Sequence, residues 1–244
     1  MIREAIGTMV AGKSLTVDEA AGVMEEIMAG DATPAQIGAF VTALRLKGET
    51  SEEIAGMAQV MRSNVLKVEY LEPLVDIVGT GGDSLNTFNI STAAALVLAA
   101  SGVKVAKHGN RAASSAAGAA DVLEACRVKI EQTPEGVARC IDEAGMGFMF
   151  APAFHPAMRH AGGPRREIGI RTVFNILGPL TNPAGASSLV VGIADPSLGE
   201  RMAQAFAQLG STHVMVVHGS DGADELTITG PSQVWEMKDG TVTH

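Results

Sequence analysis

The sequence predicts an α/β protein, with a small N-terminal helical domain and a larger domain built on a mostly parallel sheet flanked by helices. Two observations predict this class. Residues 1 to about 66 carry helix-start signals and no strand pattern, and from residue 74 onward short apolar runs alternate with helical segments. Strands that alternate with helices form mostly parallel sheets covered on both faces. We therefore expect a helical domain at residues 1–70 and an α/β domain at residues 71–244.

Threonines begin the helices of the N-terminal region. In a capping box, a threonine and an acid or amide three residues later satisfy each other's backbone N–H groups. The sequence contains such pairs at Thr16 with Glu19, Thr33 with Gln36, and Thr50 with Glu53. Glycines at positions 30 and 48 supply helix ends.

The rest of the chain alternates strand and helix patterns. Strands are expected at residues 74–78, 103–106, 148–150, 189–193, 214–217, 227–229 and 234–237. Helices are expected at about residues 93–100, 118–125, 134–144 and 197–209, and residues 154–160 as polar-aromatic loop or helix.

A glycine loop joins the first expected strand to its helix. Glycines at positions 79, 81 and 82 take backbone angles closed to other residues, and residues 89–92 offer helix caps. The N–H groups of a strand–loop–helix turn receive an anion, commonly a phosphate. The spacing matches neither the phosphate-loop pattern nor the dinucleotide fingerprint. An ordinary tight turn is the alternative.

Polar side chains follow the second expected strand, namely Lys107, His108, Asn110 and Arg111. Open α/β sheets bind ligands at the carboxyl ends of their strands, and lysine and arginine suit phosphates. No acid occurs between residues 83 and 121, although the net charge is −9. We therefore expect anion binding here, with an ordinary solvated loop as the alternative.

Asp224 and Glu225 follow a later strand and a glycine-rich turn. Adjacent carboxylates at a strand end are ligands for Mg²⁺, with the Ser91 hydroxyl as a further oxygen, and a solvated acidic turn is the alternative. Arg165 or Arg171 would clamp a carboxylate bidentately, and a structural ion pair with Glu167 is the alternative.

Composition excludes several classes of function. The net charge of −9 disfavours nucleic-acid binding. The longest apolar run, residues 93–100, is too short to cross a bilayer, and the N-terminus does not read as a secretory signal. Cys126 and Cys140 lack metal-like or redox spacing, so we expect two buried free thiols in a cytoplasmic protein.

Together these motifs resemble those of the anthranilate phosphoribosyltransferase family. The matching segments are residues 76–83, 89–92, 107–111, 171–183 and 224–225, in the family's order over essentially the whole chain. The resemblance implies transfer of the phosphoribosyl group of PRPP to the amine of anthranilate in tryptophan biosynthesis, with Mg²⁺ as cofactor. It also implies a homodimer through the helical part, and a segment of about residues 153–183 that packs back on the helical domain.

The resemblance also assigns site residues. PRPP would contact Gly79, Gly82, Asp83, Thr87, Asn89, Ile90, Ser91, Thr92, Lys107, His108, Gly109, Asn110, Arg111, Ala112, Ala113, Ser114, Ser115 and Ala119. Anthranilate would contact Gly79, His108, Asn110 and Arg165, and Mg²⁺ would be held by Ser91, Asp224 and Glu225. No general base is assigned, because the aryl amine needs alignment more than deprotonation.

The sequence departs from the family pattern in two respects. Ala116 and Ala119 stand where the family has a lysine and a phosphate-contacting serine, which predicts weaker PRPP binding. Family members also continue past the position of His244, so we expect a truncated chain whose sheet exposes an edge and apolar surface. Two alternatives stay open: a pyrimidine-nucleoside phosphorylase-like enzyme, and a non-catalytic homologue that binds nucleic acid or PRPP.

Overall fold

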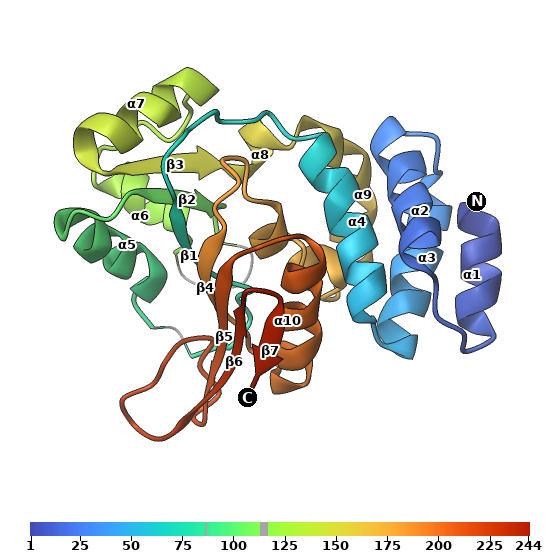
Figure 1. Ribbon diagram of the computed structural model, residues 1–244. Coiled ribbons are helices and arrows are strands. Elements are labelled where there is room, and N and C mark those ends of the chain that lie inside the picture. The colour runs from blue at the N-terminus through green and yellow to red at the C-terminus, as the bar shows by residue number, and fades with distance from the viewer. Residues whose placement is uncertain (86, 113–116) are drawn as a thin grey trace. The chain divides into compact units, whose positions relative to one another are not determined.

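The computed structural model describes residues 1–85, 87–112 and 117–244 and divides into two compact units. The helical unit comprises residues Met1–Val65 and His155–Thr181, and the sheet unit comprises Leu66–Phe154 and Asn182–His244. Figure 1 shows both units. The expected fold class, a small helical part and a larger α/β part with a mostly parallel sheet, is confirmed.

The helical unit contains α1 (Ile2–Val10), α2 (Val17–Ala29), α3 (Pro34–Lys47), α4 (Ser51–Ser63) and α9 (Arg159–Ile168). All three expected capping boxes form, at the starts of α2, α3 and α4. α2 packs against α4, and α3 packs against α1 and α9. Ile27, Phe40, Leu44 and Met57 are fully buried between these helices. No threonine marks the start of α1, whose N-cap Met1 makes no side-chain cap bond.

The strands of the sheet unit lie, within the described residues, in the order β3-β2-β1-β4-β5-β6-β7. They are β1 (Val75–Gly79), β2 (Val105–Gly109), β3 (Met146–Phe150), β4 (Ser188–Gly192), β5 (His213–Gly219), β6 (Ser232–Lys238) and β7 (Thr241–Thr243). β1 to β5 pair in parallel, whereas β6 and β7 are antiparallel. The strand expected at residues 227–229 is wrong, because the Thr227 and Thr229 hydroxyls bind Asp221 instead.

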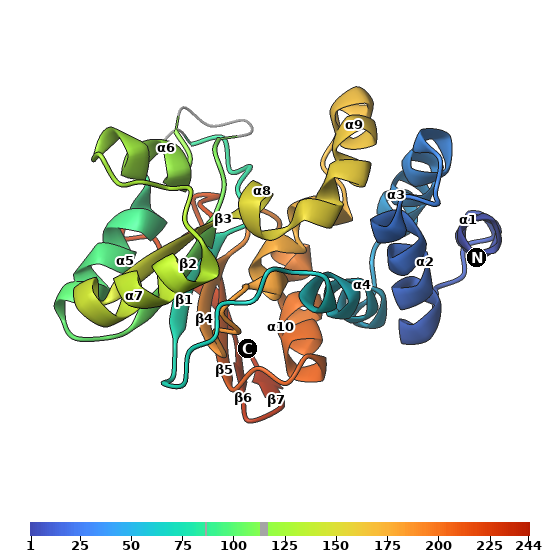
Figure 2. The ribbon, with the colours of Figure 1, turned by 90° about the horizontal axis from the view of Figure 1, so that it is seen from above.

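Helices cover both faces of the sheet. They are α5 (Ile90–Ala100), α6 (Ala119–Ala125), α7 (Pro134–Ala144), α8 (Ala151–Phe154) and α10 (Gly199–Gln208). α5 packs on β1 and β2, α10 packs on β5 and β6, and Figure 2 shows them on opposite faces. Right-handed crossovers that run in opposite directions along a sheet give this arrangement. The direction reverses between β1 and β4, where open α/β sheets bind ligands.

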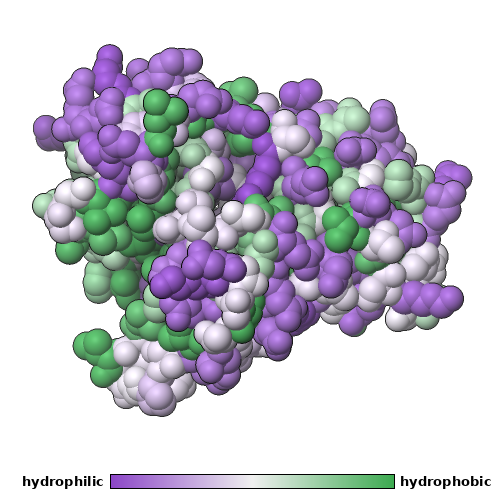
Figure 3. Space-filling view, in the orientation of Figure 1, coloured by the Kyte–Doolittle hydropathy of each residue, from purple (hydrophilic) through white to green (hydrophobic). Residues whose placement is uncertain are grey.

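Some apolar side chains of the sheet unit are exposed. Leu96 and Val97 of α5 are 51% and 70% exposed, and Figure 3 shows apolar surface over this helix. Cys126 is also exposed and Cys140 is half-buried, so the expectation of two buried thiols is wrong. Cys126 is the C-cap of α6, which places it at the surface. Among the described residues, none of the helices has the length and apolar character that a membrane span requires.

Candidate active site

The glycine loop leaves β1 at the point where the strand order reverses. Gly79 ends β1 in register with Gly192, the last residue of β4. The Thr80 N–H donates to the Gly192 carbonyl at 2.8 Å. Gly81 and Gly82 have φ angles of 65° and 91°, which only glycine adopts without strain. The loop therefore turns across the carboxyl end of β4.

Asp224 lies against this loop. Its Oδ2 accepts a hydrogen bond from the Gly81 N–H at 2.8 Å. A Cβ atom at Gly79 would come within 2.6 Å of the same oxygen, and one at Gly192 would collide with the Asp224 backbone. Glycine at both positions lets the loop after β5 approach this closely. The structure thus brings together two predicted sites that lie 143 residues apart in sequence.

Negative charge is concentrated beside the loop. Burial raises the pKa of Asp224, and the charge of Asp83 raises it further, while the Gly81 N–H lowers it. Burial and the charge of Asp224 raise the pKa of Glu225 to about 7. Burial and like charge both disfavour the ionised acids, and a bound cation would favour them.

The donor chemistry of the acid pair fits Mg²⁺. Carboxylate oxygens are the ligands that this hard cation prefers, and Mg²⁺ keeps several waters or substrate phosphate oxygens as further ligands. Within residues 1–85, 87–112 and 117–244, no group of three or more His, Cys, Asp or Glu side chains is arranged to hold a metal. Asp224 and Glu225 would therefore share the ion with the Ser91 hydroxyl, water or a substrate.

Asn89 caps α5 at the far end of the glycine loop. Its Oδ1 accepts the Thr92 N–H at 2.9 Å and the Ser91 hydroxyl at 3.3 Å. Asn89 alone is the cap. Ser91 and Thr92 lie in the first turn of α5, although the sequence suggested Asn89, Ser91 and Thr92 as possible caps. Thr92 Oγ1 is buried and has no hydrogen-bond partner among the residues that the structure describes. The start of α5 adds partial positive charge to this edge of the sheet.

Lys107 of β2 is only 1% exposed. Its Nζ donates to the Ile77 carbonyl at 2.6 Å and to Ser91 Oγ at 3.2 Å, which ties β2 to β1 and to the start of α5. Burial lowers the pKa of Lys107, and the charges of Asp76 and Glu225 oppose that shift. The predicted phosphate-binding lysine is thus held within the sheet by its own hydrogen bonds.

Asp76 belongs to this network, although the sequence assigned it no role. Its buried carboxylate accepts the His108 N–H at 3.3 Å and Asn182 Nδ2 at 2.8 Å. Asn182 Nδ2 also donates to the Ala106 carbonyl at 2.9 Å. Burial raises the pKa of Asp76 to about 6, and the charge of Lys107 opposes the shift. The sequence signal that could have revealed this role is a single acid within an otherwise apolar strand.

Asp121 organises the segment that follows β2. Arg111 pairs with Asp121 at 3.0 Å and also with an acid one turn later in α6. Asp121 Oδ2 accepts the N–H groups of both Ala112 and Gly118 at 2.9 Å. One carboxylate therefore joins the two ends of this alanine-rich segment. The sequence did not predict this role of Asp121. The guanidinium of Arg111, expected to bind phosphate, forms ion pairs with two acids in this structure.

The other predicted PRPP contacts lie around the same loops. Thr87 is exposed, Asp83 and Ile90 are half-buried, and Gly82 lies in the glycine loop. His108 and Gly109 end β2, Asn110 Oδ1 accepts the Arg111 N–H at 2.7 Å, and Ala119 begins α6. Ala113, Ser114, Ser115 and Ala116 lie outside the described residues.

Arg165 belongs to the helical unit. It lies in α9 with its guanidinium 5.3 Å from the centre of the Phe174 ring, a cation–π distance. Burial lowers the pKa of Arg165. Its role as a carboxylate clamp stays a prediction.

Known proteins resemble this chain in sequence and in fold. Residues 71–244 match the model of the glycosyl transferase family a/b domain, and residues 3–65 match that of the helical bundle domain. The chain is 62% identical over 239 residues to an anthranilate phosphoribosyltransferase of Chloroflexus aurantiacus, an alignment that covers 98% of this chain and 70% of the relative. The chain belongs to the anthranilate phosphoribosyltransferase family.

Solved structures of this family have the same fold. The Thermus thermophilus enzyme gives a TM-score of 0.89 at 50% identity, over 98% of this chain and 72% of that one. The Saccharomyces cerevisiae enzyme in complex with PRPP and Mg also gives 0.89, at 29% identity, over 96% of this chain and 70% of that one. The family resemblance drawn from the sequence motifs is therefore confirmed.

Proposed function

We propose that this chain transfers the phosphoribosyl group of PRPP to the amine of anthranilate, giving N-(5-phosphoribosyl)anthranilate and pyrophosphate, in tryptophan biosynthesis. It is an enzyme of the glycosyltransferase class, more narrowly a pentosyltransferase. One observation carries the proposal: the glycine loop and the acid at Asp224 meet where the strand order reverses. An anion-binding loop beside a cation-binding acid suits a pyrophosphate group that binds together with Mg²⁺.

The groups of the chain would act on PRPP through charge and position. Glycine-loop N–H groups and the start of α5 would face phosphate oxygens, and Lys107 supplies buried positive charge beside them. Asp224, Glu225 and Ser91 would hold Mg²⁺, which neutralises pyrophosphate charge as the C1–O bond breaks. The amine then needs alignment more than deprotonation, so we assign no general base.

Several finer assignments belong to this proposal. The PRPP contacts are those of the glycine loop, the start of α5 and the segment after β2, and anthranilate contacts Gly79, His108, Asn110 and Arg165. Family membership supports these assignments. We further propose a homodimer through the helical domain, a functional division near residue 70 with the segment of about 153–183 belonging to the helical part, and a cytoplasmic location.

The direct test is loss of anthranilate fluorescence on addition of PRPP and Mg²⁺ to the purified chain. We expect turnover that requires both additions and that falls at least a hundredfold, roughly 3 kcal/mol, when Asp224→Asn and Glu225→Gln are combined. A folded chain that leaves anthranilate unchanged would contradict the proposed activity.

A parallel assay separates the first alternative. A pyrimidine-nucleoside phosphorylase would cleave thymidine in the presence of phosphate, and we expect no such cleavage. Cleavage of thymidine without any use of PRPP would replace the proposed function by this alternative.

A further inference from the structure

The loop between β5 and β6 is built around the carboxylate of Asp221. Its Oδ1 accepts the Ala223 N–H at 3.2 Å. Its Oδ2 accepts the hydroxyls of Thr227 and Thr229 at 2.6 and 2.7 Å. The two hydroxyls are also 2.9 Å from each other. These bonds, with that of Thr227 first, lower the pKa of Asp221 to about 2, so the carboxylate is ionised at neutral pH.

These bonds enclose the acid pair on both sides. Asp224 and Glu225 are the second and third residues of the stretch that runs from Ala223 to Thr227. Asp221 holds the first residue of this stretch by its N–H and the last by its hydroxyl. One carboxylate therefore bonds to the backbone just before the two acids and to a side chain two residues after them.

Gly219 permits this tight folding at the end of β5. A Cβ atom there would lie 2.6 Å from Asp221 Oδ1, 3.1 Å from Thr227 Cβ and 3.2 Å from the Glu225 carbonyl oxygen. The first of these distances is shorter than real Cβ atoms show, and the other two are tight enough that the neighbouring atoms would have to move. The loop around Asp221 is thus packed against the strand that presents it.

We propose that Asp221 is a positioning residue, which holds Asp224 and Glu225 in the geometry that binds a divalent cation without contacting the ion itself. This inference rests on the proposed function of the acid pair. Residues that orient metal ligands through hydrogen bonds typically account for about 10- to 100-fold in metal affinity. Asp221 is exposed, so water competes for its bonds and the effect falls at the lower end of that range.

The test is isothermal titration of PRPP at a series of Mg²⁺ concentrations. Asp221→Ala removes all three bonds, and Thr229→Val removes one of them. Ile228→Ala is the matched control, because that side chain lies in the same loop and is fully exposed. We expect the Mg²⁺ concentration that half-saturates PRPP binding to rise about tenfold in Asp221→Ala, by less in Thr229→Val, and not at all in Ile228→Ala.

Asp221→Asn separates positioning from folding. Its amide oxygen still accepts the Ala223 N–H, so we expect its half-saturating Mg²⁺ concentration to lie close to that of the wild type. Equal PRPP affinity of all variants at saturating Mg²⁺ would show that the loop, and not the whole fold, is affected. If Asp221→Ala does not fold, Thr229→Val, which loses one of the three bonds, decides the question.

The outcomes distinguish the two claims. A wild-type chain that fails to bind PRPP at every Mg²⁺ concentration would overturn the proposed function, and the role of Asp221 with it. Wild-type binding whose Mg²⁺ dependence is unchanged in Asp221→Ala, or in Thr229→Val where Asp221→Ala does not fold, would overturn the role of Asp221 alone.

Discussion

The Gly81 N–H donates to Asp224 Oδ2 at 2.8 Å, a bond that spans 143 residues of sequence. Its donor is a glycine-loop amide of the kind that receives phosphate oxygens, and its acceptor is a proposed Mg²⁺ ligand. A single N–H group gives one strong bond, so a phosphate oxygen and Asp224 compete for it. PRPP binding with Mg²⁺ would therefore turn the Asp224 carboxylate from the loop toward the cation.

Gly79→Ala should impair this exchange. The new Cβ would come within 2.6 Å of Asp224 Oδ2 and displace either the carboxylate or the loop. Where the loop moves, a loop N–H loses its bond to a charged phosphate oxygen, about 1.5–3 kcal/mol, and we expect PRPP binding to weaken roughly ten- to a hundredfold in isothermal titration with Mg²⁺. Gly7→Ala in α1 is the control, because a Cβ there meets nothing within 4 Å. Unchanged PRPP affinity in Gly79→Ala would mean that the close approach has no role in binding.

Lys107→Met should destabilise the sheet unit through Asp76. The substitution leaves a buried carboxylate without its neighbouring positive charge, which costs roughly 3–5 kcal/mol of unfolding free energy in urea. Adding Asp76→Asn should recover part of this loss, with a coupling of about 1–3 kcal/mol. Lys104→Met is the control, since Lys104 is only half-buried and donates to two carbonyls. Strictly additive losses in the double variant would show that Lys107 and Asp76 do not interact.

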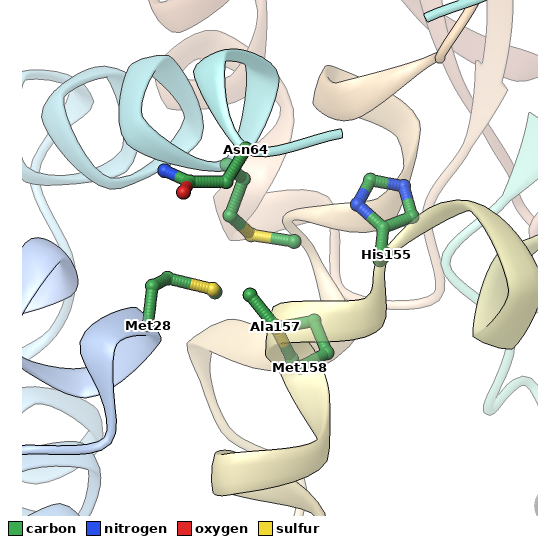
Figure 4. Close-up of a pocket in the computed structure, with 6 residues that line it drawn as sticks. Met28, Asn64, His155, Ala157 and Met158 are labelled. Carbon is green, nitrogen blue, oxygen red and sulfur yellow. The ribbon is translucent and has the colours of Figure 1, made fainter. Parts of the chain in front are cut away.

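His155 should make the helical unit sensitive to acid. It lines a small pocket together with Met28, Met158 and Asn64 (Figure 4), and burial lowers its pKa from 6.5 to about 4. The fold favours the neutral ring, so this contribution is fully present above pH 6.5 and is lost as the pH falls toward 4. It amounts to roughly 3 kcal/mol.

The measurement for His155 is the unfolding free energy in urea between about pH 4 and pH 7.5, a range that spans both the folded and the ordinary pKa. His155→Gln should flatten the pH dependence across that window, whereas the exposed His244→Gln should leave it as in the wild type. Identical pH profiles for His155→Gln and the wild type would remove His155 as the cause.

Ala119→Ser should strengthen PRPP binding. Ala119 is the first residue of α6, and the family resemblance implies a phosphate-contacting serine at this position. A hydroxyl that donates to a phosphate contributes about 1.5 kcal/mol, which corresponds to roughly tenfold in affinity by isothermal titration. Ala125→Ser, at the exposed far end of the same helix, provides the comparison. The same small change in both variants would rule out a specific role for position 119.

Structural features that depend on residues close together in sequence were predicted correctly. The three capping boxes form because a threonine and its partner three residues later need only each other. Gly81 and Gly82 turn the loop after β1 with positive φ angles, as expected for glycine. The family motifs also assigned Mg²⁺ to the acid pair Asp224 and Glu225, and that assignment stays a prediction.

Features that depend on distant or competing contacts were not predicted. Asp76 and Asn182 lie 106 residues apart, and their bond depends on where the crossover segment meets the sheet. The alternating pattern at residues 227–229 is typical of a strand, yet both threonine hydroxyls bind a carboxylate within the same loop. Side-chain bonds of this kind compete with strand pairing, and periodicity alone does not reveal them.

The most direct test of the central claim is isothermal titration of PRPP into the wild-type chain with and without Mg²⁺, repeated with Asp224→Asn and Glu225→Gln combined. Asp239→Asn is the control, because Asp239 lies on an exposed turn at φ 49°, an angle that asparagine also tolerates. We predict Mg²⁺-dependent binding in the wild type and in Asp239→Asn, and its loss in the double variant. PRPP binding that is absent from the wild type, or that persists unchanged in the double variant, would contradict a PRPP site formed by the glycine loop and the acid pair.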